Sequence, residues 1–313
     1  MNEDIIYVDY LDSYLDVTKN TVPKWIKKIL YKFLNYIGFI KCRKNYLQVT
    51  CVENDVLNEK AIKNFINKIK SINTKNIVLA DIFSNNKKFI NILESLGYFI
   101  LDGSWLYKFL AIDIVKKISY TQNLELQKME ITVVSNNDSD INIEIIKGLA
   151  QKCKVLNILT ERIDKFETVE RFLFEEYGVI INVSSNKKKT CLYSDVVLNF
   201  DFSVERINKC KFRKNTILVQ FTNEEFENRN GVTIVSVKLN LPLRYIDIFQ
   251  KFNHFYEEIL YESLIFHKLS YENCRKILEK DDVTIRYFIG NNGKIDFKEI
   301  KSCKLENNLG KNA

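Results

Sequence analysis

The chain has 313 residues, of which 46% are apolar and 28% are charged, as is typical of a folded globular protein. This length suits about two domains. The net charge of +7 is mild and the lysines are scattered, so charge alone gives no clear sign of a nucleic-acid-binding protein. No stretch is apolar over the length that a membrane-spanning helix needs.

The N-terminus and the cysteines bear on the cellular compartment. Met1 to Asp4 is acidic and lacks the basic start of a signal peptide. The seven cysteines are odd in number and form no Cys-x-x-Cys pair, which favours reduced thiols over disulfides or a zinc site. The sequence therefore predicts a cytoplasmic protein with no membrane span and no metal site.

Strand and helix patterns alternate through residues 1–118, and this alternation predicts a doubly wound α/β domain. The expected strands are short apolar runs, and the expected helices carry apolar residues three and four apart. The strands are Ile5–Leu11, Tyr46–Val52, Ile77–Phe83 and Tyr98–Leu101, and the helices lie at residues 62–69, 89–96 and 105–118. The polar run 119–128 is expected to link this domain to the next.

The expected helix from Pro23 to Gly38 has lysines between its apolar residues. Proline suits the first position of a helix. Two interpretations are open: the apolar stripe can face the core while the lysine side chains extend into water, or the helix can lie in a membrane surface. We expect the first. The stripe consists of Trp25, Ile26, Ile29, Leu30, Phe33, Leu34 and Ile37, and the lysines are Lys24, Lys27, Lys28 and Lys32.

Three acidic residues, Glu53, Asp81 and Asp102, each fall near the end of an expected strand. Ligands of open α/β sheets bind at that edge. Three carboxylates there can bind a cation or act as acid and base. The alternative is that each carboxylate caps the helix that follows it.

Residues 129–240 repeat the strand–helix pattern and predict a second α/β domain with a parallel sheet and right-handed crossovers. A helix is expected from Ile141 onward and another from Phe166 to Gly178, where glycine favours a helix end. The expected strands are Ile131–Val134, Val155–Thr160, Val179–Val183, Asp195–Phe200, Thr216–Phe221 and Val232–Val237.

Three of these segments carry a resemblance to a known family. Ile131–Val134, Asn157–Arg162 and Ser194–Asn199 resemble, in order and character, the NADP-binding domains of glutamyl-tRNA reductase and shikimate dehydrogenase, over residues 130–222 only. The resemblance implies a Rossmann-like fold. It also implies that Arg162 matches the arginine that faces the 2′-phosphate of NADP in those families.

The loop Ser135-Asn136-Asn137-Asp138-Ser139-Asp140 stands where the family has its Gly-x-Gly-x-x-Gly turn, and it contains no glycine. Side chains there keep the backbone away from a diphosphate. Asp138 and Asp140 add negative charge at a helix N-terminus, where they can take the place of a bound anion. The candidate cofactor-binding residues are Ser135, Asn136, Asn137, Asp140 and Arg162.

Two functional hypotheses follow. The first is a binding or regulatory protein for a small molecule or a protein partner, on a degenerate Rossmann-like scaffold without tight dinucleotide binding and with no cofactor. The alternative is an NADP-dependent oxidoreductase with an atypical phosphate loop. Lys187-Lys188-Lys189 can attract phosphate or form a solvated charge run. No catalytic residue can be assigned.

The remaining residues, 241–313, predict a long helix, a β-hairpin and a tail. The helix is expected over Leu243–Leu269, and its aromatic stripe should be buried. A hairpin is expected from Thr284–Ile289 and Lys294–Ile300 around a glycine-bearing loop. Lys301–Ala313 is expected to fray. His254 and His267 are the only two histidines, and we expect surface or packing roles for both.

Overall fold

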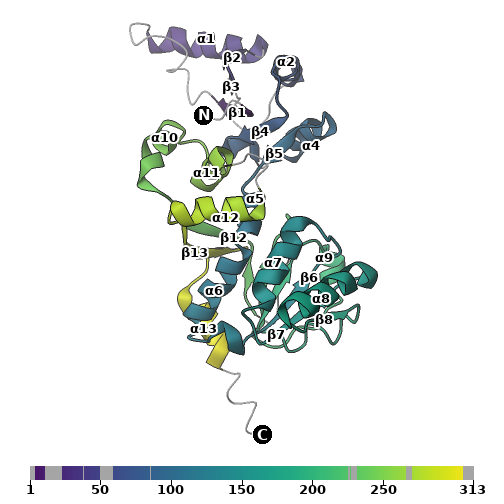
Figure 1. The fold of residues 1–313 in the computed structure, drawn as a ribbon. Helices are drawn as coiled ribbons and strands as arrows, with labels where there is room; N and C mark the ends of the chain where they lie inside the picture. The colour runs from purple at the N-terminus through teal and green to yellow at the C-terminus, as the bar shows by residue number, and fades with distance from the viewer. Residues whose placement is uncertain are drawn as a thin grey trace. The chain divides into compact units, whose positions relative to one another are not determined.

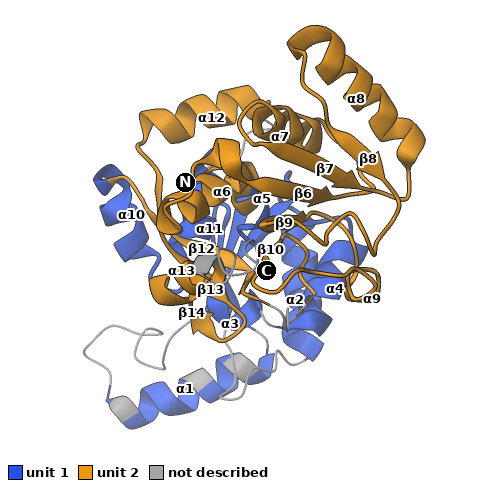
Figure 2. Cartoon of the chain, turned by 90° about the horizontal axis from the view of Figure 1, so that it is seen from below, with its two compact units in different colours: residues 1–105, 243–268 blue, residues 106–242, 269–313 orange. Residues whose placement is uncertain are grey.

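The computed structural model describes residues 4–10, 23–37, 39–49, 59–84, 86–224, 226, 231–265 and 270–305. The chain divides into two compact units, one made of residues 1–105 and 243–268 and the other of residues 106–242 and 269–313 (Figure 2). Each unit therefore combines two separate stretches of sequence.

The division falls at Trp105 and Leu106, and not in the polar run 119–128. Residues 119–121 are the end of helix α6 (Ala111–Thr121), which buries Ile114, Val115 and Ile118 within the second unit. The expected helix over 105–118 is two helices, α5 (Ser104–Phe109) and α6.

The first unit contains a five-stranded sheet in the order β2-β3-β1-β4-β5. All pairs are parallel except β2 and β3, which form an antiparallel hairpin that the sequence did not reveal. Because the chain runs from β1 to one side and then to the other, the sheet is doubly wound, as predicted. The strands are β1 (Ile5–Tyr10), β2 (Ile40–Arg43), β3 (Tyr46–Val49), β4 (Asn76–Leu79) and β5 (Phe99–Leu101).

Helices of the first unit pack against this sheet or against one another (Figure 1). Helix α2 buries Ala61, Phe65 and Ile69, the positions at helical spacing that predict a core-facing side. Asp81 begins a short helix, so the expected strand over Ile77–Phe83 ends at Leu79. The helices are α1 (Lys24–Ile37), α2 (Glu59–Ile69), α3 (Asp81–Ser84), α4 (Lys87–Ser95), α10 (Ile246–Lys251) and α11 (Glu257–Ile265).

The prediction of one continuous helix over Leu243–Leu269 is wrong. A 3-10 turn, η2 (Leu243–Tyr245), leads into α10, and the chain leaves the helical conformation at Phe252 before α11 begins. Phe252 and Phe255 pack on Tyr7 of β1, with ring centroids 6.1 and 6.4 Å away. The break turns these aromatic rings onto the sheet of the first unit.

The expectation that α1 faces the core is also wrong. Trp25, Ile29 and Phe33 are 66%, 61% and 56% exposed, whereas Lys27 is buried. The helix thus rests on its unit through a different side from the one that its apolar stripe predicts.

The second unit contains a six-stranded, wholly parallel sheet in the order β11-β10-β9-β6-β7-β8. If these strands are numbered 1 to 6 in chain order from β6 to β11, their order across the sheet, starting at β8, is 3-2-1-4-5-6. This is the Rossmann arrangement. The predicted Rossmann-like parallel sheet is confirmed. The strands are β6 (Glu130–Val134), β7 (Val155–Leu159), β8 (Asn182–Ser184), β9 (Val196–Asn199), β10 (Ile217–Gln220) and β11 (Thr233–Ile234).

Two helices connect the first three of these strands, α7 (Asp140–Ala150) and α8 (Ile163–Tyr177). Gly178 ends α8 in the left-handed conformation with φ of 65°, as predicted. A Cβ added to Gly148 of α7 would lie 2.5 Å from Ile112 Cδ1, so this glycine lets α7 approach α6.

The expected sixth strand, Val232–Val237, divides between two sheets. β11 completes the parallel sheet, and β12 (Ser236–Asn240) pairs antiparallel with β13 (Thr284–Gly290) in a sheet of order β12-β13-β14. The backbone N–H of Val235 donates to Ile289 O at 2.9 Å between the two. The single apolar run Val232–Val237 therefore contributes to strands of two sheets.

The predicted C-terminal hairpin is confirmed, but its second strand, β14, covers only Gly293–Lys294. Helix α13 (Phe297–Leu305) follows and buries Ile300 and Cys303, so the expectation of a strand to Ile300 is wrong. Residues 301–305 of the expected tail are helical, and the rest of that tail, 306–313, lies outside the described residues. Helix α12 (Tyr271–Lys280) was not predicted. In the described part of the chain, no helix is long and apolar enough to cross a membrane.

Candidate functional site

The loop after β6 lies where the strand order of the second unit reverses. β6 pairs with β7 on one side and with β9 on the other, and the chain turns back between them. In open α/β sheets, ligands bind outside the carboxyl ends of the strands at this point. The loop from Ser135 to Ser139 joins that end of β6 to α7.

The Asp201 carboxylate fills this loop. It accepts the backbone N–H of Asn136 at 2.8 and 3.0 Å and that of Asn137 at 2.8 Å. The Ser135 hydroxyl donates to Asp201 Oδ2 at 2.7 Å. Successive backbone N–H groups directed at one anion form the kind of nest that binds phosphate in many proteins. Here the anion comes from the chain itself.

The turn after β9 positions Asp201. Asn199, fully buried, donates from Nδ2 to Phe202 O and Gln220 Oε1, both at 2.9 Å, and its Oδ1 accepts the N–H of Phe202 at 3.0 Å. The Phe202 ring is buried in the core. These contacts fix residues 199–202, so the Asp201 side chain is directed across to the end of β6.

Lys108 brings positive charge near this carboxylate. Burial lowers the pKa of Lys108, and the charge of Asp201 partly raises it again. The Lys108 ammonium also lies 5.1 Å from the centre of the Phe200 ring. The positive charge of Lys108, in the same unit, therefore partly offsets the negative charge of Asp201.

The prediction that Asp138 or Asp140 would replace a bound anion named the wrong residues. Asp138 pairs with Lys165 of α8 at 2.6 Å, and the hydrogen bond from Lys165 is the main cause that lowers the pKa of Asp138. Asp140 is the exposed first residue of α7. Neither carboxylate reaches the backbone N–H groups that bind Asp201.

The loop is held in shape by its own polar side chains. Asn142 of α7 is fully buried and donates from Nδ2 to Ser135 Oγ at 3.1 Å and to Asn137 O at 2.7 Å. Asn136 Oδ1 accepts the N–H of Glu161 at 2.7 Å and the Thr160 hydroxyl at 3.2 Å. Ser135, Asn136 and Asn137 thus join the ends of β6, β7 and β9.

Glu161 closes the network at the end of β7. Its carboxylate binds Lys187 Nζ at 2.6 Å and an Arg206 guanidinium nitrogen at 3.2 Å. The hydrogen bond from Lys187 is the main cause that lowers the pKa of Glu161. Lys187 is therefore paired, and it is not a member of a free lysine cluster.

Arg162 lies at the end of β7, where the resemblance implies it. Its backbone N–H donates to Thr160 Oγ1 at 3.0 Å at the start of α8. Its side chain is exposed. Arg162 and Asp140 take no part in the hydrogen bonds around Asp201, whereas Ser135, Asn136 and Asn137 do.

The three acids proposed for the first unit do not form a described site. Glu53 lies outside the described residues. Asp81 Oδ1 accepts the N–H of Ile82 at 2.7 Å, and Asp102 Oδ1 accepts that of Ser104 at 2.9 Å. Both carboxylates bind helix starts, as the alternative expected. Within the described ranges no group of acids, histidines and cysteines is arranged to hold a metal ion.

A polar cluster that sequence reasoning missed lies at the end of β1. Asp9, only 4% exposed, lies 2.7 Å from His254 Nδ1 and accepts a hydrogen bond from the Tyr46 hydroxyl. The Tyr10 ring stacks on His254 with centroids 4.3 Å apart. An aspartate within an apolar strand was the available signal, but its partner is distant in sequence.

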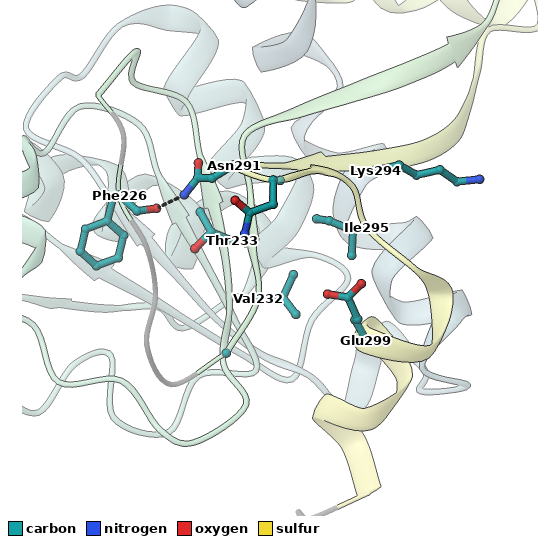
Figure 3. A pocket seen from close by; sticks show the side chains of 10 residues that line it. Phe226, Val232, Thr233, Asn291, Lys294, Ile295 and Glu299 are labelled. Carbon is teal, nitrogen blue, oxygen red and sulfur yellow. Dashed lines mark hydrogen bonds between the residues drawn. The ribbon is translucent and has the colours of Figure 1, made fainter.

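A hollow of about 520 Å³ lies beside the C-terminal hairpin (Figure 3). Thr233, Ile295 and Glu299 line it, and Asn291 donates to Phe226 O at 2.9 Å at its edge. Among the described residues that line it, Glu299 supplies a carboxylate and Lys294 an ammonium, and these two groups make no catalytic arrangement.

No family model and no curated protein matches the chain. Similar solved structures include the L-tryptophan dehydrogenase of Nostoc punctiforme (12% identity, 68% of this chain, 61% of that one, TM-score 0.29). They also include the dipicolinate synthase A chain of Bacillus subtilis (10% identity, 66% of this chain, 63% of that one, TM-score 0.31). A third is a putative aspartate carbamoyltransferase of Trypanosoma cruzi (13% identity, 69% of this chain, 68% of that one, TM-score 0.25). Such TM-scores carry no argument about function, and the Rossmann-like assignment rests on the strand order of the second unit.

Proposed function

We propose that this is a binding or regulatory protein whose Rossmann-like unit holds an internal carboxylate in place of a dinucleotide phosphate. The observation that supports the proposal is the position of Asp201 on the N–H groups of Asn136 and Asn137 and on the Ser135 hydroxyl. The ligand is a small molecule or a protein, and no cofactor is needed.

Competition for the same N–H groups is the physical reason. A diphosphate at this loop needs the donors that Asp201 already uses, and its charge would meet the carboxylate. If Asp201 leaves, at least two hydrogen bonds to a charged group are lost, which costs on the order of 3 kcal/mol, or about 100-fold in affinity. Tight binding of NAD or NADP is therefore not expected.

The alternative function is an NADP-dependent oxidoreductase, and the exposed Arg162 favours it. A guanidinium can bind two phosphate oxygens at once. For this function Asp201 would have to turn out of the loop when NADP binds.

Calorimetry distinguishes these functions. We expect no micromolar binding of NAD or NADP to the wild-type protein. We expect Asp201→Ala to gain binding of inorganic pyrophosphate, because the substitution frees the backbone N–H groups that bind the Asp201 carboxylate. Asp140→Gly should gain nothing, because Asp140 does not contact the nest. Asp195→Ala is the matched control, since Asp195 binds the Glu130 N–H at 2.9 Å elsewhere in the same unit.

Two results would count against the proposal. Micromolar binding of NADP to the wild type, lost in Arg162→Ala, would establish the oxidoreductase alternative. No gain of pyrophosphate binding in a folded Asp201→Ala would mean that the nest is not a phosphate site occupied by a substitute.

A further inference from the structure

Helix α1 presents a row of apolar side chains to solvent. Trp25, Ile29, Phe33 and Tyr36 are 66%, 61%, 56% and 68% exposed, and Ile26 and Ile37 are each 38% exposed. At 100° per residue these six positions occupy one continuous side of the helix. Large apolar groups gathered in this way mark an interaction surface, unlike single exposed residues.

The types of side chain around α1 are arranged as in a helix that lies at a membrane–water interface. Lys28 and Lys32 are exposed and lie next to Trp25 on the helix surface, while Leu30 and Leu34 are part-buried on the other flank. Tryptophan and tyrosine prefer the boundary between apolar and polar surroundings. Here Trp25 and Tyr36 lie between the lysines and the purely apolar Ile29 and Phe33.

The first unit holds α1 in this orientation. The Lys60 ammonium of α2 lies 4.4 Å from the centre of the Tyr36 ring, and Asn64 Nδ2 donates to Ile37 O at 3.0 Å. Lys27 is buried on the opposite flank from Trp25. Contacts with α2 therefore fix the orientation of α1 in which the apolar row faces solvent.

The surrounding charge is strongly asymmetric. Residues 24–70 contain eleven basic residues and three acidic ones, a net charge of +8, whereas the whole chain is +7. The segments 24–49 and 59–70 carry all eleven basic residues and one of the acids, Glu59. These segments form α1, β2, β3 and α2, which lie at one end of the first unit (Figure 1). The basic residues are Lys24, Lys27, Lys28, Lys32, Lys41, Arg43, Lys44, Lys60, Lys63, Lys68 and Lys70.

We propose that α1 docks the first unit on an anionic lipid bilayer, with Trp25, Ile29 and Phe33 in the interfacial layer and Lys28 and Lys32 at the headgroups. Apolar burial combined with attraction to anionic lipids is the binding mode of such helices. A nucleic acid would use the lysines but would leave Ile29 and Phe33 in water. The proposal is independent of the function proposed for the second unit.

Vesicle co-sedimentation tests the docking. We expect the protein to bind vesicles of phosphatidylcholine mixed with phosphatidylserine far better than vesicles of phosphatidylcholine alone, and less at high salt. Lys28→Gln with Lys32→Gln should weaken binding about 30-fold, since each lysine near an anionic surface contributes about fivefold. Lys188→Gln with Lys189→Gln, two exposed lysines of the second unit, should change nothing.

Removal of the apolar row gives the decisive comparison. Ile29→Ser with Phe33→Ser should abolish vesicle binding, whereas Phe174→Ser with Ile180→Ser, 59% and 73% exposed in the second unit, should not. In a Trp105→Phe background, Trp25 emission should shift to the blue on anionic vesicles. Circular dichroism should show the lysine and apolar variants folded, because their altered side chains are exposed, and the Trp105→Phe background folded, because one aromatic ring replaces another at a partly buried position.

Three results would overturn the proposal. These are no binding of the wild type to anionic vesicles, full binding by the folded Ile29→Ser, Phe33→Ser variant, or tighter binding of an oligonucleotide that this variant retains. The last result would identify the basic surface as a nucleic-acid site.

Discussion

Asp201 and the loop after β6 show how single hydrogen bonds replace a missing ligand. The carboxylate uses donors from Ser135, Asn136 and Asn137, so part of its contribution depends on charge. Asp201→Asn keeps the shape of the side chain but replaces one accepting oxygen by an NH2 group. That group is a donor, and it would face the N–H and hydroxyl donors of the loop. We expect the free energy of unfolding in urea to fall by about 1–2 kcal/mol. Asp140→Asn, at an exposed position, should stay within about 0.5 kcal/mol of wild type.

Two tyrosines differ in what their hydroxyl groups contact. The Tyr271 hydroxyl is buried without a hydrogen-bond partner, and burial raises the pKa of Tyr271 to about 12. The Tyr7 hydroxyl lies 3.0 Å from Ser263 Oγ. We expect Tyr271→Phe to keep or raise the free energy of unfolding and Tyr7→Phe to lower it by about 1 kcal/mol. A larger loss in Tyr271→Phe than in Tyr7→Phe would contradict this reading.

Cys153 provides a test that depends on pH. Burial raises the pKa of its thiol to about 11. Since the thiolate is the reactive form, roughly 0.1% of Cys153 is reactive near pH 8. Its alkylation by iodoacetamide, followed by peptide mass spectrometry, should accelerate about tenfold per pH unit up to about pH 11. A rate that levels off below about pH 9 would show an ordinary thiol.

At the scale of elements, the strands of the Rossmann-like sheet were predictable because their signal is local. β6, β9 and β10 are short runs of apolar residues, buried on both faces. Gly178 likewise ended α8 where expected. The loop residues Ser135 to Asn137 were recognised as the candidate site from their place after β6.

Elements whose ends depend on distant residues were not predictable in this way. The helical period persists through Phe252, and the break there coincides with its packing on Tyr7, far away in sequence. Asp201 was missed for the same reason: only the pairing of β9 with β6 brings it to the loop. Local pattern predicts which element forms, whereas sheet order decides which side chains meet.

Gly231 lies two residues before β11 and leaves no room for a side chain. A Cβ there would lie 2.1 Å from the backbone oxygen of Thr216, beside β10. A backbone oxygen cannot move away from the new Cβ by rotating, as the end of a side chain can. We therefore expect Gly231→Ala to lower the free energy of unfolding by about 3 kcal/mol.

Gly148→Ala is the matched control for that substitution. Its Cβ would meet only the flexible tip of Ile112, and alanine favours a helix over glycine by about 1 kcal/mol. Urea denaturation should therefore show a much smaller loss than for Gly231→Ala, and equal losses would contradict the steric argument.

At the scale of the whole molecule, the first unit is built from two distant pieces of chain. Helix α11 buries Leu260 and Tyr261, and His254 contacts Asp9 of β1. We expect residues 1–105 alone to show no cooperative thermal transition by circular dichroism. Residues 1–105 joined to 243–268 by a flexible linker should show one. Cooperative unfolding of the shorter fragment at the same midpoint would contradict the two-piece architecture.

This discontinuity also sets an order of events during synthesis. Translation at roughly 5–20 residues per second leaves about 8–30 s between the emergence of β5 and that of α11. During this interval the apolar residues that α11 covers have no partner in the nascent chain, while the six strands of the second unit, from Glu130 to Ile234, are already available to pair. The ribosome therefore delivers all six strands of the Rossmann-like sheet before the last piece of the first unit, so the first unit can be completed only after those strands have been made.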